Sequence, residues 1–457
     1  MKANNQKSLR VIKRKEMKIG VIGGGLMGLA TAYYLNKKGH EVTILEKEKE
    51  IGGLSSSEEI LPGFYWDRFY HVILTTDNQL LEFLGELGLS EDIRFRETKT
   101  GFYTDGQLHS MSTTIEFLQF KPLSLIDKLR LGAGILYASK IKNWKRLEKN
   151  TAKAWLIGIF GRRNYEKMWE PLLRAKLGAA KDKISAAFIW STIRRYYGTR
   201  QKSSKKEMMG CADSGYSFIL NHLNDYLLRH GTTIFKGYCA NRIEQINGKR
   251  IAVKSNKGIS FVFDRVIATT PTPTISNLSS DFTDEFRFKL ENIKYLGIVC
   301  VTLLLKKSIT PFYVTNLTDN GLPFTGLIEA TNVMPKKILN GKSLVYLPKY
   351  VAPEDPFFKK TDQEILHEFL SALKKMFPDL NDEDILTYKI NRESYVQPVQ
   401  EIGYSEKIPS MQTPVNNFYM ANTAMIQNSN VNNNEVIKIA RKAADLVANS
   451  DEFSNRR

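Results

Sequence analysis

Cysteine is scarce in this chain, which has three in 457 residues. Cys211, Cys239 and Cys300 are far apart, form no CxxC pair and have no histidine cluster near them. This spacing excludes a disulfide scaffold and argues against a structural zinc site, so no metal site is predicted. Such sparse use of cysteine suits the reducing cytoplasm, where we expect the protein to be located.

Long hydrophobic runs are also absent. No segment has the roughly 18 consecutive apolar residues that a membrane-spanning helix needs. The basic start of the chain lacks the apolar region of a secretory signal. Residues 1–16 are expected to be either a disordered basic arm or an over-extension before a true initiator at Met17. The second alternative is favoured, because a strand pattern begins directly after Met17.

Acidic residues are outnumbered, with 48 Asp and Glu against 66 Lys and Arg, giving a formal net charge of +18. Such a surface favours nucleic acid, acidic lipid head groups, or phosphorylated and carboxylated substrates. No basic and aromatic nucleic-acid-binding motif occurs, so no nucleic-acid partner is predicted. Residues 122–146 mix apolar residues at helical spacing with lysines and arginines. They predict a helix that either lies on the inner face of an anionic membrane or covers the core as a cap.

The most informative stretch is VIGGGLMGLATAYYLNKKGHEVTILEKEKEIGGLSSS, at residues 21–57. A short apolar run over residues 18–22 predicts a buried parallel strand. Apolar residues then recur at helical spacing from Leu26 until Gly39, a glycine typical of helix ends. Residues 41–45 predict a second strand, so the stretch reads as one βαβ unit.

Three glycines stand where this unit turns from strand to helix. Gly23 permits the tight turn, Gly25 lets a pyrophosphate approach the backbone, and Gly28 lets the helix pack closely on the strand. The first helical turn, at Leu26 and Met27, presents free amide groups and the positive end of the helix dipole. The spacing therefore predicts a dinucleotide whose phosphates lie at this helix N-terminus.

An acid and a second glycine pair follow. Glu46 closes the second strand, where a carboxylate accepts hydrogen bonds from ribose hydroxyls and disfavours the 2′-phosphate of NADP. The next segment, KEKEIGGLSSS, resembles the one after the ribose-binding acid in the superfamily of flavin amine oxidases, protoporphyrinogen oxidases and phytoene desaturases. UDP-galactopyranose mutases look similar there. The resemblance implies FAD, with Leu54 where the family often has Arg. Its implied contacts in this segment are Lys47, Gly52, Gly53, Leu54 and Ser55.

The resemblance extends at low density over nearly the whole chain. It implies an α/β fold with a Rossmann-like FAD-binding domain of the glutathione reductase-like type, a mixed-sheet substrate domain and a helical cap. Thr269 and Asn422 match positions beside the cofactor, although relatives usually have Gly-Asp where this chain has Ala421-Asn422. The expected divisions are an N-terminal extension (1–16), an FAD-binding domain (17–76, 206–275 and 413–448), a substrate domain (77–114 and 276–412), a cap (115–205) and a tail (449–457).

The chain has no nucleophilic triad or paired-carboxylate motif, as expected if a flavin supplies the chemistry. Three residues are candidates for contact with flavin or substrate. His71 lies in GFYWDRFYH, and Tyr395 lies in SYVQPVQEIGYS. Arg174 belongs to a group of charges in apolar sequence that could bind an acidic substrate group. The alternatives are a buried structural role for His71, core packing for Tyr395 and internal ion pairs for the charged group. That charged group comprises Glu170, Arg174, Lys176, Arg194 and Arg195.

These patterns favour an FAD-dependent oxidoreductase, similar to amine oxidases or protoporphyrinogen oxidases. It would remove a hydride from a C–N or C–C bond of a sizeable lipophilic or acidic small molecule bound between the lobes. The alternative is an enzyme similar to UDP-galactopyranose mutase, which acts on a nucleotide sugar without net redox change. A basic, non-enzymatic binding protein is a third interpretation, to be adopted if the protein takes up no FAD.

Overall fold

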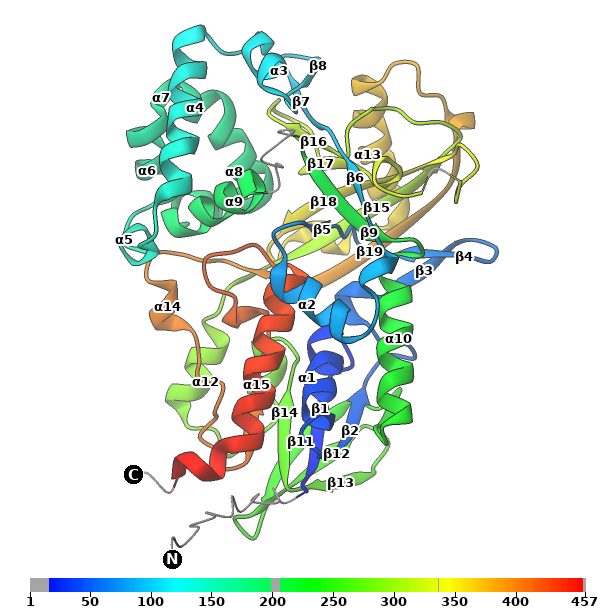
Figure 1. The fold of residues 1–457 in the computed structure, drawn as a ribbon, viewed down its shortest axis with the longest axis vertical. Helices are drawn as coiled ribbons and strands as arrows, with labels where there is room; N and C mark the ends of the chain where they lie inside the picture. The colour runs from blue at the N-terminus through cyan, green and yellow to red at the C-terminus, as the bar shows by residue number, and fades with distance from the viewer. Residues whose placement is uncertain (1–15, 199–205, 336, 455–457) are drawn as a thin grey trace, which may run out of the picture.

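The computed structural model describes residues 16–198, 206–335 and 337–454. The chain forms two lobes (Figure 1): a lower one around a parallel sheet, and an upper one with a mixed sheet and a group of helices. Apart from Glu16, the expected N-terminal extension lies outside the described residues, as does the end of the expected tail, 455–457.

A five-stranded sheet, parallel throughout, forms the centre of the lower lobe. Its middle strand is the apolar run of residues 18–22, and four of those five residues are buried. Segments far apart in the sequence supply its neighbours. The strand order is β10 (Thr233–Lys236), β2 (Glu41–Glu46), β1 (Lys18–Ile22), β14 (Arg265–Ala268) and β20 (Phe418–Met420).

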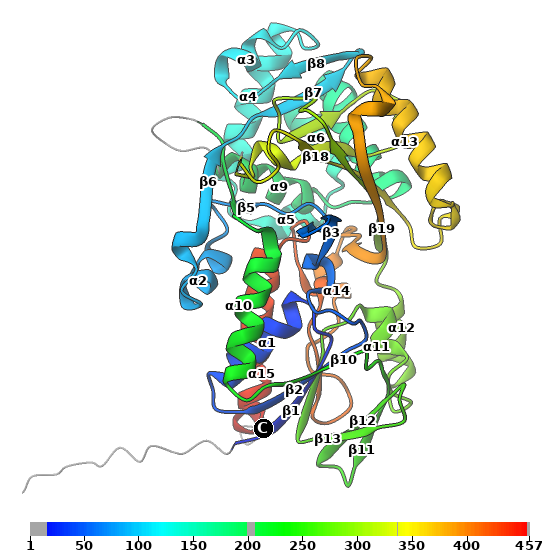
Figure 2. The same cartoon turned by 90° about the vertical axis from the view of Figure 1, so that its right-hand side faces the viewer.

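Helix α1 (Leu26–Asn36) packs between α10 (Gly215–Arg229) and α15 (Asn433–Ser454). Ten of its eleven residues are buried, so this helix has no polar face. Figure 2 shows these helices on one side of the parallel sheet and a three-stranded antiparallel sheet on the other. The latter consists of β11 (Ala240–Ile246), β12 (Arg250–Ser255) and β13 (Ser260–Phe263).

A seven-stranded mixed sheet forms the upper lobe, and helix α13 (Asp362–Met376) covers one face of it. All eleven residues of its long strand β15 (Tyr295–Leu305) are buried, as expected from the run YLGIVCVTLLL. Ile365, Phe369 and Leu373 of α13 pack against this strand, as their helical spacing predicted. The order is β19 (Ile385–Pro398), β15 (Tyr295–Leu305), β18 (Ser343–Val351), β17 (Gly326–Glu329), β16 (Val314–Leu317), β7 (Thr100–Thr104) and β8 (Gln107–Ser110).

The helical cap stands beside the mixed sheet (Figure 1). Its core includes Leu131, Leu156, Phe160, Phe188 and Trp190. Its helices are α3 (Thr114–Gln119), α4 (Leu125–Lys140), α5 (Trp144–Glu148), α6 (Ala152–Phe160), α7 (Arg162–Asn164), α8 (Glu170–Leu177) and α9 (Ala186–Gly198). A π-helical turn, Tyr165–Trp169, joins α7 to α8.

Short elements connect the lobes. The hairpin β3 (Ser57–Leu61) and β4 (Phe64–Asp67) follows the second glycine pair. A small sheet then joins distant segments, in the order β5 (Ile73–Leu74), β9 (Met208–Ala212) and β6 (Ile93–Glu97). The other helices are α2 (Asn78–Glu86), α11 (Thr272–Ser276), α12 (Asp284–Glu291) and α14 (Tyr404–Lys407).

Two of these helices, α2 and α12, pack into the core of the lower lobe. Leu80 and Phe83 of α2, and Phe286 and Leu290 of α12, belong to the same hydrophobic cluster as the parallel sheet. Because a domain is defined by a shared core, we propose that both helices belong to the FAD-binding domain. The boundaries expected at 76/77 and 275/276 then move to the far ends of these helices.

Candidate functional site

The first glycine loop joins β1 to α1 at the carboxyl edge of the parallel sheet. Gly23 has a φ of 104°, which residues with side chains rarely adopt. A Cβ atom on Gly28 would lie 1.9 Å from the carbonyl oxygen of Gly23, so the helix packs directly on the turn. A Cβ atom on Gly25 would meet nothing closer than Gly53 Cα, at 3.8 Å. The space above Gly25 is therefore open to a ligand.

The first turn of α1 lies beside that space. Gly25 precedes the helix in an extended conformation, and no side chain caps the amides that follow it. Leu26 and Met27 are buried, with 3% and 7% of their surfaces exposed, so their side chains pack inward. Uncapped amides at a helix N-terminus attract an anion such as a pyrophosphate.

The second glycine pair crosses directly over the first loop. The amide of Gly52 donates to the carbonyl oxygen of Gly24 at 2.8 Å, and Gly52 also pairs with Gly25 as a parallel bridge. Both glycines of the pair have positive φ, 119° at Gly52 and 56° at Gly53. Added Cβ atoms would lie 2.8 Å from the Leu220 side chain at Gly52 and 3.1 Å from Gly25 Cα at Gly53. The two glycine motifs therefore form one interlocked backbone structure.

Glu46 closes β2 beside this loop and is 6% exposed. Its Oε2 accepts a hydrogen bond from the amide of Gly24 at 2.6 Å, and its Oε1 accepts one from the amide of Glu48 at 2.8 Å. A carboxylate oxygen has more than one lone pair, so acceptor capacity remains for ribose hydroxyls. Lys47 points to solvent, where its ammonium pairs with Glu48 at 3.4 Å. The structure thus brings Glu46 to the loop and leaves Lys47 outside it.

The end of β14 meets the same loop from the other side. The Thr269 hydroxyl donates to the carbonyl oxygen of Gly23 at 3.2 Å. The side-chain amide of Asn422 donates to the Thr270 carbonyl oxygen at 2.9 Å, and its Oδ1 accepts from the amide of Ala424 at 3.0 Å. The Thr270 hydroxyl is buried and has no hydrogen-bond partner among the described residues. A bound ligand at this edge would satisfy it.

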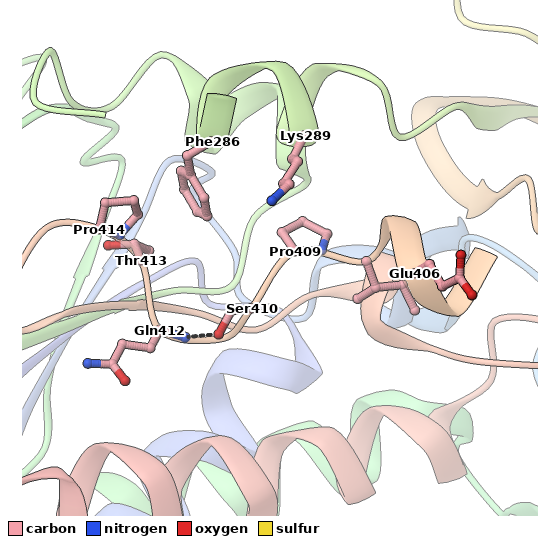
Figure 3. Close-up of a pocket in the computed structure, with 9 residues that line it drawn as sticks. Phe286, Lys289, Glu406, Pro409, Ser410, Gln412, Thr413 and Pro414 are labelled. Carbon is pink, nitrogen blue, oxygen red and sulfur yellow. Dashed lines mark hydrogen bonds between the residues drawn. The ribbon is translucent and has the colours of Figure 1, made fainter. Parts of the chain in front are cut away.

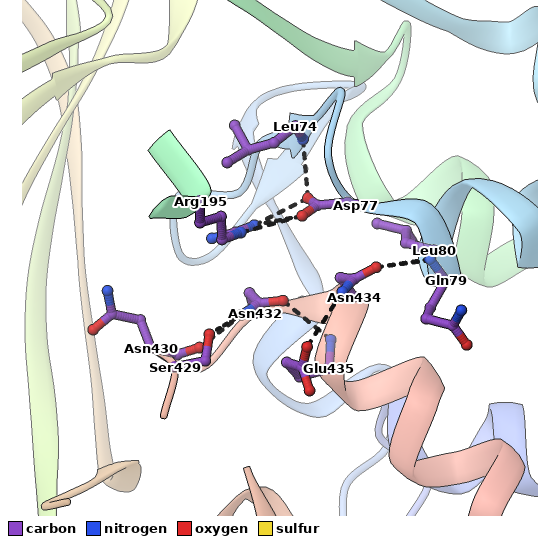
Figure 4. Close-up of polar contacts among 10 residues, drawn as sticks. All are labelled: Leu74, Asp77, Gln79, Leu80, Arg195, Ser429, Asn430, Asn432, Asn434 and Glu435. Carbon is purple, nitrogen blue, oxygen red and sulfur yellow. Dashed lines mark hydrogen bonds and ion pairs between the residues drawn. The ribbon is translucent and has the colours of Figure 1, made fainter. Parts of the chain in front are cut away.

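The segment after the second glycine pair leads to the N-terminus of α15. Leu54 is half-buried in the core below the mixed sheet, and Ser55 is buried with its hydroxyl 3.5 Å from Oδ1 of Asn433. Asn432 caps the helix by accepting from the amide of Glu435 at 3.1 Å (Figure 4). The run of asparagines therefore joins the second glycine segment to the start of the last helix.

An ion pair lies close to the start of α15 (Figure 4). The guanidinium of Arg195, on the cap helix α9, binds both carboxylate oxygens of Asp77 at 2.9 and 3.0 Å. The amide of Leu74 also donates to this carboxylate at 2.9 Å. Asp77 is 2% exposed and immediately precedes α2. No local sequence pattern predicts Asp77, because its partner Arg195 lies in a different part of the chain.

Asp67, His71 and Tyr216 form a buried group at the junction of the lobes. The Asp67 carboxyl accepts from the amide of Tyr216 at 2.9 Å, and burial raises the pKa of Asp67 to about 7. The His71 ring is 3.7 Å from this carboxyl and 4.9 Å, between ring centres, from Tyr216. His71 Nδ1 lies 2.9 Å from the carbonyl oxygen of Phe69, and burial lowers the pKa of His71 to about 4. Because a carbonyl only accepts, Nδ1 carries the proton and Nε2 of the neutral ring is an acceptor.

Next to His71 in the chain, Tyr70 belongs to a cluster of aromatic and cationic side chains, which we call the tyrosine cluster. The hydroxyls of Tyr70 and Tyr350 are 2.9 Å apart, and the ammonium of Lys176 lies 5.2 Å from the centre of the Tyr350 ring. Desolvation is the largest cause of the pKa shifts of these residues and of Tyr196. They come from the connector after β4, from α8 and α9, and from β18, so the tyrosine cluster joins the cap, the mixed sheet and the connector to the lower lobe.

The other two candidates from sequence lie apart from this group. Arg174 pairs with Glu170 at 2.8 Å and also contacts the side chain of Asn320. Tyr395 packs edge-on against Tyr295 and lines a pocket of about 410 Å³ with Asn241 and others of the lower lobe. Of the three, His71 alone is the chain neighbour of a residue of the tyrosine cluster, Tyr70.

A second surface pocket, of about 550 Å³, lies between α12 and the segment after α14 (Figure 3). Phe286, Lys289 and Pro409 line it, and Lys289 already pairs with Glu285 at 2.7 Å. This pocket holds no group of reactive side chains. Among the residues that the structure describes, no three His, Cys, Asp or Glu side chains are grouped to hold a metal ion.

Comparison with known proteins agrees with this geometry. The family model for flavin containing amine oxidoreductase matches residues 26–448. A zeta-carotene desaturase from Synechocystis is 22% identical, over 89% of this chain and 92% of its own. An oxidoreductase structure from Methanosarcina mazei has a TM-score of 0.73 at 20% identity, covering 94% of this chain and all of that one. Reduced UDP-galactopyranose mutase has a TM-score of 0.72 at 16% identity, covering 94% and 95%.

Proposed function

Because the chain belongs to the family of flavin-containing amine oxidoreductases, we propose that it removes a hydride from a C–N or C–C bond of a sizeable lipophilic or acidic molecule. The chain is a flavin oxidoreductase, its cofactor is FAD and its substrate is a small molecule. The observation that best supports the proposal is the tyrosine cluster between the cap and the mixed sheet, which continues from His71 through Tyr70.

The proposed FAD contacts start at the interlocked glycine loops. Gly25 and the first amides of α1 would hold the pyrophosphate, and Glu46 would hold the ribose. Three features fit such a ligand: the open space at Gly25, the uncapped helix end and the unpartnered hydroxyl of Thr270. The full proposed set is Gly23, Gly25, Leu26, Met27, Gly28, Glu46, Gly52, Gly53, Leu54, Ser55, Thr269, Thr270 and Asn422; Lys47 would act through its backbone only.

FAD supplies the hydride acceptor when it is bound. The chain's own residues would do the rest. The N-terminus of α15 would stabilise negative charge on the reduced cofactor through its dipole. His71 would offer Nε2 as a hydrogen-bond acceptor to cofactor or substrate, since its Nδ1 proton is held by Phe69. The enclosing side chains would keep water from the reacting atoms.

A C–C bond is the better supported site of oxidation. The relative from Synechocystis is named a zeta-carotene desaturase, and the match covers most of both chains. A desaturase forms a double bond by removing two hydrogens from adjacent carbons. The cluster beside His71 consists mainly of tyrosines, whose rings suit a lipophilic substrate.

The mutase alternative is less well supported. It requires arginines that are free to bind a sugar diphosphate. Arg174 is engaged with Glu170, and Arg195 with Asp77. Arg194 is exposed and stacks over Trp190 at 5.4 Å. We therefore rank mutase chemistry second.

The absorbance spectrum of the purified protein tests the proposal, with the released cofactor identified by chromatography. We expect a flavin spectrum and FAD. Under anaerobic conditions, polyenes and amines are then added to the oxidised protein; bleaching of the flavin band supports the oxidoreductase. Turnover of a nucleotide sugar only after reduction with dithionite would instead support the mutase, and a colourless protein that takes up no FAD would contradict both.

We also propose a peripheral contact between the cap and the cytoplasmic face of a membrane. The helix expected within residues 122–146 was predicted either to lie on a membrane or to cover the core. On α4, Leu131, Gly134 and Ala138 are buried, whereas most of its larger apolar side chains are exposed. Positions 125, 126, 129, 136 and 137 lie on one side of this helix, because they follow a 3.6-residue period. We call the following exposed residues the cap patch: Ile115, Leu118, Leu125, Ile126, Leu129, Leu136 and Tyr137, between 48% and 78% exposed.

The charge around the cap patch suits an anionic lipid surface. Exposed basic residues flank it and have no ion pair with any residue of the described ranges. The nearby acidic residues are turned inward: Asp127 pairs with Arg163 at 3.2 Å, and Glu148 binds Ser405. No helix within the described residues is long and apolar enough to cross a bilayer. The exposed basic residues that flank the cap patch are Lys121, Lys140, Lys142, Lys145 and Arg146.

Sedimentation with vesicles tests this contact. The full chain should bind vesicles of phosphatidylcholine and phosphatidylglycerol, and bind pure phosphatidylcholine more weakly. Leu129→Glu with Leu136→Glu should abolish binding without changing the melting temperature. Leu228→Glu, at a leucine 52% exposed on α10, is the matched control and should bind as the wild type does. If the double variant bound these vesicles as tightly as the wild type does, the cap patch would not be the membrane contact.

A further inference from the structure

The cap helices α8 and α9 carry four cations within apolar sequence, and one of them differs from the rest. Arg174 and Arg195 are in ion pairs, and Arg194 is exposed over Trp190. Lys176 has no hydrogen bond or ion pair with any residue that the structure describes. Its ammonium lies 5.2 Å from the centre of the Tyr350 ring.

Lys176 is half-buried and lacks a negative partner among the described residues. Desolvation and, secondarily, repulsion from the nearby Arg195 together lower the pKa of Lys176 to about 8. The other groups around it are neutral phenols. The Tyr350 hydroxyl is 2.9 Å from that of Tyr70, and Tyr196 interacts electrostatically with both.

A desolvated ammonium without a partner costs stability, whereas an anion beside it recovers that cost. The tyrosine cluster also supplies phenolic hydroxyls that can donate to an anion. We propose that Lys176 is the counter-ion of an anionic oxygen group, a carboxylate or a phosphate ester, on a lipophilic substrate that binds at this cluster. The inference rests on the proposed function, because it assigns the substrate class of the same site. An uncharged hydrocarbon would leave Lys176 unpaired.

Binding of ten-carbon probes to the FAD-loaded full chain tests the proposal. Decanoate, decyl phosphate and decanol have the same alkyl chain and differ in the head group. We expect an anionic probe to bind at least about tenfold more tightly than decanol, by calorimetry and by perturbation of the flavin spectrum. The tighter of the two anions identifies the head group.

Three variants identify the residue responsible. Lys176→Met should reduce the affinity for the anion to that for decanol, and Lys176→Arg should retain most of the difference. Lys349→Met is the matched control. Lys349 is the neighbour of Tyr350 on β18, faces the other side of the sheet and has its ammonium 4.6 Å from the Phe357 ring. This control should bind the anion as the wild type does.

Anion affinity should also fall as the pH rises above the pKa of the lysine, and Lys176→Arg should remove that fall. Equal affinities for decanol and both anions, or an unchanged anion affinity in Lys176→Met, would overturn the proposal. Calorimetry does not require a flavin signal. A protein that takes up no FAD would therefore contradict the oxidoreductase function while the anion titration still decides the role of Lys176.

Discussion

The backbone amide of Gly24 donates a 2.6 Å hydrogen bond to the carboxylate of Glu46, so the residue that closes β2 holds the loop that follows β1. The parallel pairing of the two strands makes this contact possible, since it brings both carboxyl ends to one edge of the sheet. The same carboxylate oxygens are the proposed acceptors for the ribose. One acid therefore serves both the shape of the glycine loop and the ligand beside it.

Glu46→Gln should weaken FAD binding by about tenfold, because hydrogen bonds to a charged acceptor exceed those to a neutral amide by about 1.4 kcal/mol. Fluorescence titration of the apoprotein with FAD measures this. Glu48→Gln is the control, since Glu48 contacts Glu46 only through its backbone amide and its side chain is exposed. Equal losses in the two variants would contradict a specific role for Glu46.

Gly28→Ala should lower the stability of the fold, whereas Gly25→Ala should lower the affinity for FAD and leave the stability unchanged. At Gly28 the new methyl group would lie 1.9 Å from the Gly23 carbonyl oxygen, so we expect a loss of more than about 2 kcal/mol in the free energy of unfolding. At Gly25 the methyl group meets no protein atom within 3.8 Å, so the apoprotein should unfold as the wild type does. FAD affinity should nevertheless fall at least about tenfold, because the methyl group occupies the phosphate space. Normal FAD affinity in Gly25→Ala would contradict the proposed position of the pyrophosphate.

Arg195→Met should destabilise the protein by about 3 kcal/mol, because it leaves the buried Asp77 carboxylate without its counter-ion. Adding Asp77→Asn should restore part of the loss, since the buried charge is then removed. Chemical denaturation of Arg195→Met, of Asp77→Asn and of the double variant measures the coupling energy between the two side chains. Arg194→Met, one residue earlier and exposed, should change stability little. Additive losses in the double variant would argue that the two side chains act independently.

Asp67→Asn should stabilise the protein above pH 7. Burial raises the pKa of Asp67 from 3.8 to about 7, so the folded state binds more protons than the unfolded state between these values. Stability from this group is therefore full below about pH 4 and is lost as the pH rises to 7, by about 4 kcal/mol. His71, with its pKa lowered to about 4, has the opposite effect between pH 4 and 6.5. The difference between wild type and Asp67→Asn, measured by denaturation from pH 4 to 8, isolates Asp67; a constant difference would contradict the raised pKa.

Lys176→Met should raise the free energy of unfolding at pH 7 by about 2 kcal/mol, because a desolvated charge is removed. The pKa of Lys176 falls from 10.5 in the unfolded chain to about 8 in the folded protein. The unfolded state therefore binds more protons between these values, and the wild type should gain stability as the pH rises from 8 to 10.5. The advantage of the variant should shrink across the same window. A loss of stability on substitution would show that the ammonium supports the fold.

Local patterns were sufficient for the elements of the lower lobe. The apolar run before Gly23, the helical spacing after Leu26 and the strand closed by Glu46 all appear where they were expected. The flavin family follows from the order of these motifs, which Gly52 and Gly53 extend. Helix α4 was less predictable, because it has two apolar faces, one buried in the cap and one exposed. Periodicity alone does not show which of two apolar faces is buried.

The sequence by itself determined the dinucleotide loop and the flavin family, because both depend on motifs whose residues lie close together along the chain. Only the tertiary structure decided which charged side chains have an ion-pair partner. Arg195 meets Asp77 from the other lobe, Arg174 meets Glu170 within its own helix, and Lys176 meets only the ring of Tyr350. The physical reason is that the energy of a buried charge depends on the groups around it in space, and folding brings these together from distant segments.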